Sequence, residues 1–515
     1  MPSTQTDHLF KLIKALSKSE KRSFKLYANR ISGSETALFV QLFDVLDKQN
    51  EYEEETIFQR VPGIKRSQLS NLKRHLYKQL LTSLRLIHID KHPDIEIREQ
   101  IDHARILYSK GLYMQSLKVL DRTKKVAMDA HQDLLHLEIN EFEKMIESRH
   151  ITRSIENRAN ELSDENRRRS KVVRRAGKLS NLALKLYGLY IKIGHIRNED
   201  DVTLVEEFFR ANFPEDINYD ELTFYERIHY NQCYVWYYYI LQNFPQHYRA
   251  TERWLEVFDQ FPHMKTLDPD LYLRGLNNQL GGLFFMGYYS RHEQIVDTLE
   301  TFYQQNRTKF NTNTAVLAFL TRYTAKLNNH FMEGTFTQGL ELVPDLKRQL
   351  KKHHLHLDQH HTLSFYYKIA CLYFGSGDPD TAVDWLNKII NMRAGNLRAD
   401  IQCYARILHL ICHYELGNNY LLEYLVKSVY RFLAKMDSLD QVQQEILRFL
   451  RRELYTDPKS LGKAFRKLRA KLLKLKEDPF QRRSFLYLDI EAWLESKIEG
   501  KKVERVIAGN FEGMR

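Results

Sequence analysis

Proline and glycine are scarce in this sequence, with 11 and 20 residues among 515. Because these residues interrupt helices and mark turns, their scarcity favours a helical fold and argues against a strand-rich one. No glycine-, serine- or proline-rich linker divides the chain, although it is longer than one compact core allows. An array of repeated helical units resolves this conflict, because the core of such an array grows by addition.

Cysteine and long apolar runs are also lacking. Four cysteines lie in apolar helical patterns without CxxC spacing, so we expect reduced core residues rather than a disulfide framework: Cys233, Cys371, Cys403 and Cys412. No run of 18 apolar residues occurs, and charged side chains interrupt the first apolar positions. This pattern indicates neither a membrane span nor a signal peptide, so a cytoplasmic protein is expected.

The short motifs of common enzyme classes are absent from the sequence. It contains no GxxxxGK[ST] phosphate loop, no GxGxxG after a strand, no HExxH helix and no GxSxG elbow. Acidic residues and histidines are plentiful, but they are scattered in helical surface patterns. We therefore expect no enzyme, no catalytic residues and no cofactor.

A helical hairpin is predicted at residues 365–390. Small residues let two helix backbones approach, large residues fill the space beside them, and a Gly-Asp-Pro turn at 377–379 interrupts the helical hydrogen bonds. The residues that set this spacing are Ala370, Tyr373, Gly377, Ala382 and Leu386. The same offsets recur at 101–125 in Ala104, Gly111, Ser116 and Leu120, and with larger residues at 410–426. Residues 183–194 and 280–302 are expected to form further, degenerate hairpins.

The pattern A-x2-Y-x3-G-x4-A-x3-L in this hairpin resembles the tetratricopeptide repeat. The resemblance implies an all-α fold, in which antiparallel helix pairs stack into a superhelical α-solenoid behind a small N-terminal helical domain. The expected domains are an N-terminal bundle at 1–90, repeats at 91–455, and a basic amphipathic helix with capping helices at 456–515.

The function implied by this resemblance is that of a non-enzymatic scaffold or adaptor, which binds a protein or peptide in a solenoid groove. Since the first helix of each pair lines that groove in the family, Tyr108 and Tyr366 are candidate contacts. The aromatic segment 224–240 adds Tyr234 and Tyr237, with Tyr230 and Trp236 beside them, because its many rings cannot all point inward from one helix face. These rings are equally consistent with core packing, and a homodimer is also left open.

Residues 1–90 lack the hairpin pattern and suggest a different function. A short helix near 53–61, a turn at Pro62-Gly63 and a basic amphipathic helix capped by Ser67 form a candidate helix-turn-helix. Lys73, Arg74 and Lys78 lie off its leucine stripe. The alternative function is therefore a DNA-binding transcriptional regulator with a TPR-like sensor body. The competing interpretation is a helical cap that shields the end of the repeats.

Two basic segments also need partners for their charge. The segment 165–178 contains Arg168 and Arg174 and is balanced either by solvent and neighbouring acids or by a phosphate backbone. The segment 461–478 places apolar residues on one seam, which favours packing on the last repeat over an anionic surface. The net charge of +12 favours an acidic partner or nucleic acid without deciding between them.

A histidine-rich segment at 351–361 raises the question of metal binding. On a helix, His353, His356 and His360 would share one face, near enough to hold one ion. Only Asp358 is a nearby carboxylate in the sequence, so a surface run of histidines is the favoured interpretation. No metal site is predicted.

Overall fold

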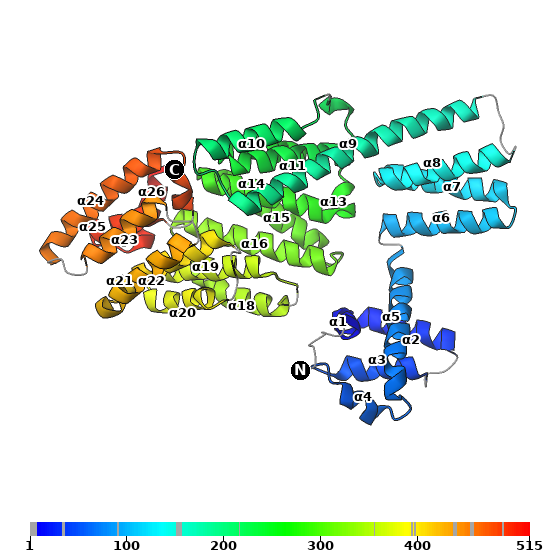
Figure 1. Ribbon diagram of the computed structural model, residues 1–515, viewed down its shortest axis with the longest axis horizontal. Helices are drawn as coiled ribbons and strands as arrows, with labels where there is room; N and C mark the ends of the chain where they lie inside the picture. Colours follow the sequence, from blue (N-terminus) through cyan, green and yellow to red (C-terminus); the bar gives the residue numbers. More distant parts are fainter. Residues whose placement is uncertain are drawn as a thin grey trace. The chain divides into compact units, whose positions relative to one another are not determined.

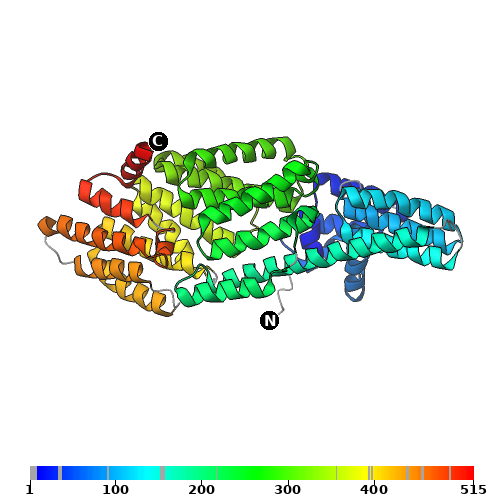
Figure 2. The same ribbon diagram turned by 90° about the horizontal axis from the view of Figure 1, so that it is seen from above.

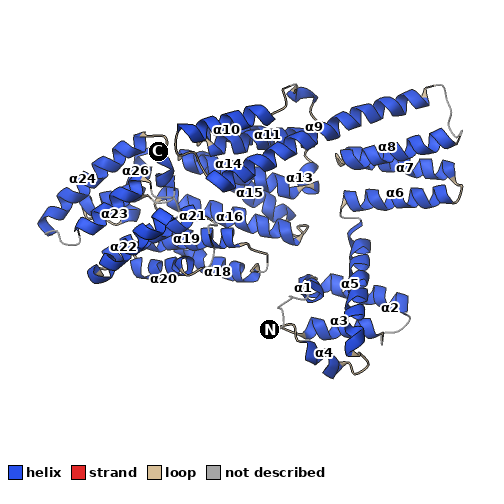
Figure 3. Ribbon diagram, in the orientation of Figure 1, coloured by secondary structure: helices blue, strands red, loops and turns tan. Residues whose placement is uncertain are grey.

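The structure is a computed structural model, in which every regular element is a helix (Figures 1 and 3). It describes residues 8–32, 37–89, 92–150, 157–215, 217–354, 356–392, 395, 398–435, 440–453, 458–486 and 489–514. No strand occurs within these ranges. The prediction of an all-α protein is therefore confirmed.

The chain forms two compact units, residues 1–173 and 174–515. Their division falls inside the long helix α9 (Arg158–Ile193). The predicted domain boundaries between 90 and 91 and between 455 and 456 fall on residues outside those described.

Unit 1 begins with a bundle around its own apolar core, in which Phe24, Phe43 and Leu76 are buried (Figure 1). Its helices are α1 (His8–Ala15), α2 (Lys18–Ser32), α3 (Leu38–Lys48), α4 (Glu54–Arg60) and α5 (Arg66–His88). The short helix, turn and long helix predicted here are present as α4 and α5. The predicted cap is wrong, because Lys65 occupies the N-cap position and Ser67 lies in the first turn.

The remainder of unit 1 consists of helices that lie side by side (Figures 1 and 2). They are α6 (Pro93–Ser109), α7 (Tyr113–Asp129), α8 (Asp133–Arg149) and the first half of α9. Helix α6 packs against α7, and α7 packs against α8. The hairpin predicted at 101–125 is thus α6 and α7, and Gly111 in the turn has the left-handed φ of 77°.

Unit 2 continues with helix pairs, among which α11 packs against α12, α19 against α20 and α21 against α22. Its first helices after α9 are α10 (Glu199–Asn212), α11 (Phe224–Ile240), α12 (Phe244–Gln260), α13 (Met264–Leu267), α14 (Pro269–Met286), α15 (Tyr289–Asn306), α16 (Thr312–Glu333), α17 (Phe336–Gly339) and α18 (Val343–Lys352). Later helices are α19 (Gln359–Ser376), α20 (Pro379–Ile390), α21 (Ala399–Glu415), α22 (Asn419–Lys435), α23 (Gln441–Glu453), α24 (Pro458–Glu477), α25 (Ile490–Glu499) and α26 (Val503–Met514).

The hairpin of α19 and α20 shows how the predicted spacing works. Gly377 ends α19 with a φ of 91°, which a residue without Cβ adopts at little cost. The next residue, Asp378, caps α20 by accepting a hydrogen bond of 3.0 Å from the Thr381 amide, and Pro379 occupies the first turn. Ala370 and Ala382 are fully buried in the core, where their small side chains let the helices approach.

Two of three other segments predicted to be helical hairpins have that structure. Residues 280–302 lie in the pair α14 and α15, and residues 410–426 lie in the pair α21 and α22, so both are helical hairpins. The expectation for residues 183–194 is wrong, because this segment is the last part of α9, which ends before Gly194. Its small residues Ala183 and Gly188 lie within one continuous helix rather than at a turn.

The predicted apolar seam of α24 is buried. Phe465, Leu468 and Leu472 are between 2% and 4% exposed and belong to the same core as α19–α23. Cys371, Cys403 and Cys412 belong to or contact this core, and Cys233 is buried in a second one. All four cysteines are free of disulfides, as expected.

Candidate binding cavity

A cavity of about 1790 Å³ lies within unit 2. Most of its wall comes from the helices α9, α11, α14, α16 and α19, with part of α12 (Figure 1). Residues of the C-terminal segment, among them Lys476, Phe485 and Ile507, form another part of the wall. Pockets for drug-sized ligands occupy roughly 300–1,000 Å³, so this cavity has room for a longer occupant.

Aromatic side chains form one wall of the cavity. The ring centroids of Phe244 and Phe285 are 4.7 Å apart, and Tyr239 lies 6.3 Å from each of them. Trp236 meets Tyr239 edge to face at 6.0 Å. Such rings offer a large contact area with little loss of side-chain entropy, which suits them to binding.

An apolar strip on α9 extends this wall to the exposed surface of the protein. Leu184, Tyr187 and Ile191 line the cavity yet are 68%, 44% and 55% exposed. Their spacing of three and four residues puts them on one face of the helix. Because apolar side chains at a cavity mouth lose contact with water when an occupant covers them, the strip favours binding at this rim.

A polar cluster from α16, α19 and the start of α21 lies elsewhere in the same wall. Lys368 Nζ donates a hydrogen bond of 2.6 Å to Asn328 Oδ1 and lies 5.7 Å and 5.3 Å from the ring centroids of Phe284 and Phe331. Arg398 binds the Asp400 carboxylate through Nε and Nη2 at 2.7–3.1 Å.

The Arg398 guanidinium also organises its neighbours in this cluster. Its Nη1 donates to Ser364 Oγ and lies within hydrogen-bonding distance of His360 Nε2, both at 3.3 Å. Since a guanidinium only donates, His360 accepts at Nε2 and carries its proton on Nδ1. Burial, together with the nearby Arg398 charge, lowers the pKa of His360 to about 4, so this ring is neutral at pH 7.

Burial also tunes two other groups in the cavity wall. The pKa of Lys368 is lowered to about 8 by burial and by the charge of Arg398, so its ammonium form still predominates at pH 7. The side chain keeps some accessible surface because it lines the cavity. Burial raises the pKa of the Cys371 thiol to about 12, which leaves it protonated and a poor nucleophile.

The tyrosines predicted from the sequence lie outside this cavity. Tyr234 packs among Phe209, Phe213 and other rings between α10 and α11. Tyr237 meets Phe209 at 4.2 Å and lines a separate hollow of about 450 Å³. Both therefore lie on the opposite side of α11 from the cavity wall, and the structure does not bring them into it.

The two other predicted tyrosines have packing partners of their own. Tyr366 on α19 meets Trp385 edge to face at 5.3 Å. Tyr108 belongs to unit 1, where its ring contacts Tyr113 and Phe142, and its hydroxyl lies 3.4 Å from His150 Nε2. Neither residue lines the cavity.

The face of α11 that does line the cavity could have been found from spacing. His229, Gln232, Trp236 and Tyr239 are separated by three, four and three residues, which places them on one helix face. Of the rings predicted from aromatic density in this segment, Trp236 lines the cavity, whereas Tyr234 and Tyr237 do not. The polar cluster carried no local signal, because Lys368 and Arg398 are 30 positions apart and separated by α20.

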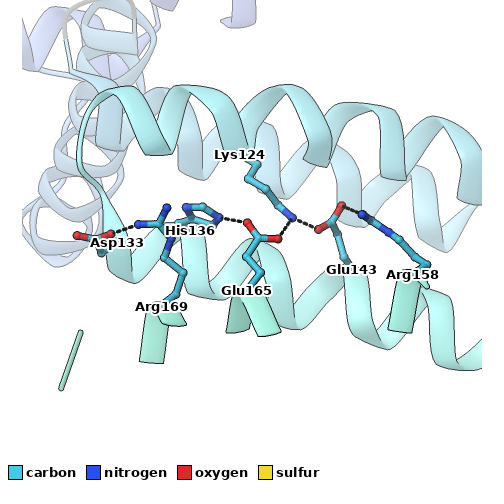
Figure 4. Close-up of polar contacts among 7 residues, drawn as sticks. All are labelled: Lys124, Asp133, His136, Glu143, Arg158, Glu165 and Arg169. Carbon is cyan, nitrogen blue, oxygen red and sulfur yellow. Dashed lines mark hydrogen bonds and ion pairs between the residues drawn. The ribbon is translucent and has the colours of Figure 1, made fainter. Parts of the chain in front are cut away.

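A second polar cluster holds α9 against α7 and α8 in unit 1 (Figure 4). Lys124 lies between Glu143 and Glu165, and Arg158 also binds Glu143 at 3.3 Å. The other end of Glu165 contacts His136 at 2.7 Å. The remaining pair is Arg169 Nη1 and Asp133 Oδ1 at 2.8 Å. Three cations thus face three carboxylates, so the cluster is balanced and its role is to fix α9.

Contacts and burial in this cluster shift the pKa values of two of its carboxyl groups. The hydrogen bond of Glu165 with His136 and the contacts with Lys124 lower the pKa of Glu165 to about 2 in spite of burial. Glu143 has no exposed surface, and burial raises its pKa although Lys124 and Arg158 act in the opposite direction. In the basic segment 165–178, carboxylates of other helices neutralise two cations, because Arg169 pairs with Asp133 and Arg175 pairs with Glu226.

The predicted nucleic-acid contacts are divided between exposed and occupied residues. Arg168 and Arg174 are exposed on α9, and Arg74 and Lys78 are exposed on α5. Lys73 is instead partly buried, because its ammonium contacts the Tyr52 hydroxyl and lies 4.4 Å from that ring. Of the three residues predicted on α5, only Arg74 and Lys78 thus present their charges to solvent.

The histidine-rich segment does not form the single helix face that was considered from its sequence. His353 follows α18 and stacks on Phe319 at 5.4 Å, whereas His360 begins α19. Within the described ranges, no group of three or more His, Cys, Asp or Glu side chains is placed to hold a metal ion. No helix in the same ranges is long and apolar enough to cross a bilayer.

Comparison with protein-family models, with curated proteins and with solved structures finds no match to this chain. The residues of the cavity and of the basic surfaces are therefore the basis on which a function can be proposed.

Proposed function

We propose that this chain is a non-enzymatic interaction protein. Its helix pairs stack side by side as a TPR-like α-solenoid, and an extended protein or peptide segment binds in the cavity of unit 2. The observation that carries the proposal is the cavity of about 1790 Å³, lined by aromatic side chains and continued by the exposed apolar strip on α9.

The chemistry of the wall supports binding rather than turnover. Trp236, Tyr239 and Phe285 supply apolar contact area, which contributes about 25 cal/mol for each Å² removed from water. The high pKa of Cys371 and the low pKa of His360 leave a protonated thiol and a neutral ring at pH 7. A protonated thiol is a weak nucleophile, so the wall favours contact over covalent chemistry.

Selection of peptides by the immobilised full chain tests this function. A displayed library of random peptides should yield binders rich in aromatic and aliphatic residues. Leu184→Glu should weaken these binders at least about tenfold, because a carboxylate then stands at the apolar rim. Leu134→Glu is the matched control, since Leu134 on α8 is 65% exposed and Leu184 is 68% exposed. Equal binding by both variants, or no selected binder, would contradict the proposal.

DNA binding by residues 1–90 is a second candidate function. The specific observation is that α4, the turn and α5 have the order of a helix-turn-helix, with Ile57, Val61 and Ile64 buried beneath it. Arg74 and Lys78 on α5 carry exposed positive charge. In this case unit 2 would serve as a sensor body, and the full chain would bind duplex DNA in a salt-dependent manner.

A further inference from the structure

Lys368 differs from Lys124 and Arg398 in its partners. Lys124 in unit 1 contacts two carboxylates, and Arg398 is bound by Asp400. Among the residues that the structure describes, no carboxylate lies within ion-pair distance of Lys368 Nζ, whose hydrogen bond goes to the Asn328 amide. Buried charges in proteins are generally paired, because an unpaired charge away from water is costly.

The described neighbours of Lys368 supply no negative charge to its ammonium group. Asp400 pairs with Arg398, and His360 beside it is neutral. The rings of Phe284 and Phe331 attract the ammonium only weakly compared with a carboxylate. An anionic group with access to Nζ would gain more, because charge-assisted hydrogen bonds are strong where water is displaced.

The position of Lys368 in the wall indicates what kind of anion fits. Besides Lys368, the cavity wall includes residues of α9 to α16 and, later in the sequence than α19, Arg398, Ile401 and Phe485. The volume of about 1790 Å³ leaves room for an extended occupant that continues past Lys368 rather than ending there. A side-chain carboxylate reaches a lysine without ending the chain.

We infer that Lys368 forms an anion subsite, which receives the carboxylate of an acidic side chain within the bound segment. The aromatic wall of Trp236, Tyr239 and Phe285 holds an apolar side chain of the same segment. This inference rests on the proposed function, since it concerns the same cavity. It adds the charge of the occupant and the residue that recognises it.

Two fluorescent probes test the subsite without knowledge of the natural partner. The probe 8-anilinonaphthalene-1-sulfonate carries an anion on an aromatic body, and N-phenyl-1-naphthylamine has the same body without the anion. Lys368→Met in the full chain should weaken binding of the sulfonate probe about tenfold and leave the neutral probe within about twofold. Lys326→Met is the matched control, because Lys326 lies on α16 outside the cavity wall and pairs with Glu300.

A measurement on the unaltered protein complements this variant. Raising the pH from 7 to 9.5 removes the proton from Lys368, whose pKa is about 8, and should weaken the sulfonate probe but not the neutral one. Lys368→Met should abolish this pH dependence. Sulfonate binding that is unchanged by both the variant and the pH would overturn the subsite.

The probes also separate failure of the subsite from failure of the proposed function. If the neutral probe binds and the sulfonate probe shows no dependence on Lys368, only the subsite is wrong. If neither probe binds the full chain, the cavity is closed to ligands, and both proposals are overturned.

Peptides selected on the wild type identify the source of the anion. Internal Asp or Glu should be enriched, and binding should survive amidation of the peptide C-terminus; dependence on a free C-terminus would overturn the side-chain assignment.

Discussion

Gly334 and Ala508 lie too close together for a side chain to fit between them. A Cβ at position 334 would stand 2.5 Å from the backbone nitrogen of Ala508 and 2.7 Å from the carbonyl oxygen of Glu504. Gly334 ends α16 with a left-handed φ of 69°, and Ala508 lies on α26. Two cavity-lining residues, Val503 and Ile507, belong to α26, so this contact holds part of the cavity wall in place.

The first prediction concerns Gly334→Ala. The added carbon should displace α26 and raise the hydrogen-exchange rates of the amides at 503–513. This increase should exceed the one expected from the backbone cost of alanine in the left-handed region alone, which is about 1 kcal/mol. Gly287→Ala is the control for that cost, because Gly287 ends α14 with a φ of 70° and has open space around it. Equal protection of α26 in both variants would show that the close approach is not needed.

The second prediction concerns the cluster that holds α9 (Figure 4). Lys124→Met leaves Glu143 and Glu165 without their shared cation, and breaking a buried pair in this way costs about 3–5 kcal/mol. The amides of α7 and α8 should therefore exchange at least about 100-fold faster, as measured on the full chain.

Lys144→Met provides the control for this cluster. Lys144 pairs with Glu141 on the exposed side of α8, where an ion pair contributes about 0–1 kcal/mol. Its replacement should leave the exchange rates of α7 and α8 almost unchanged. A similar effect of both substitutions would mean that the buried ion pairs of Lys124 stabilise α7 and α8 no more than the exposed pair of Lys144 does.

The local parts of this fold could be predicted from the sequence. The hairpin of α19 and α20 follows from Gly377, Asp378 and Pro379, whose backbone preferences act within a few residues. The hairpin expected at 183–194 failed because a glycine can also lie within a helix, as Gly188 does in α9. Local glycine spacing alone does not distinguish a turn from a continuous helix.

The candidate site could be predicted only in part. The aromatic segment 224–240 was identified as a binding element, and Trp236 within it lines the cavity. Tyr234 and Tyr237 point to α10 instead, because the position of a neighbouring helix decides which face of α11 is covered. The electrostatic proximity of Lys368 and Arg398 depends on how α19 and α21 pack, which no short sequence pattern encodes.

The third prediction concerns acid pH. Burial, with the charges of neighbouring His413 and Arg406, lowers the pKa of His409 to about 4 in the fold, against an ordinary value of 6.5. The unfolded chain therefore binds this proton first, so the contribution of His409 to stability is complete above pH 6.5 and lost as the pH falls toward 4. Between pH 7 and pH 5 the loss is about 1–2 kcal/mol for this histidine.

Thermal unfolding at pH 7, 6 and 5 measures this effect. His409→Gln should reduce the drop in melting temperature of unit 2, because the substituted side chain takes up no proton. His103→Gln, at an exposed position on α6, should leave the drop unchanged. Identical pH profiles for the wild type and His409→Gln would contradict the assignment of a depressed pKa to this residue.

The fourth prediction tests whether α5 binds DNA. Arg74→Glu/Lys78→Glu reverses two exposed charges one turn apart on α5, whereas Lys118→Glu/Arg122→Glu makes the same change on α7. If α5 contacts the phosphate backbone, the first pair should weaken binding to duplex DNA at least about tenfold and lower the salt slope by about 2. Fluorescence anisotropy with the full chain at several salt concentrations measures both quantities. An equal loss for the two pairs would assign the binding to overall charge rather than to the helix-turn-helix, since only a local contact distinguishes α5 from α7.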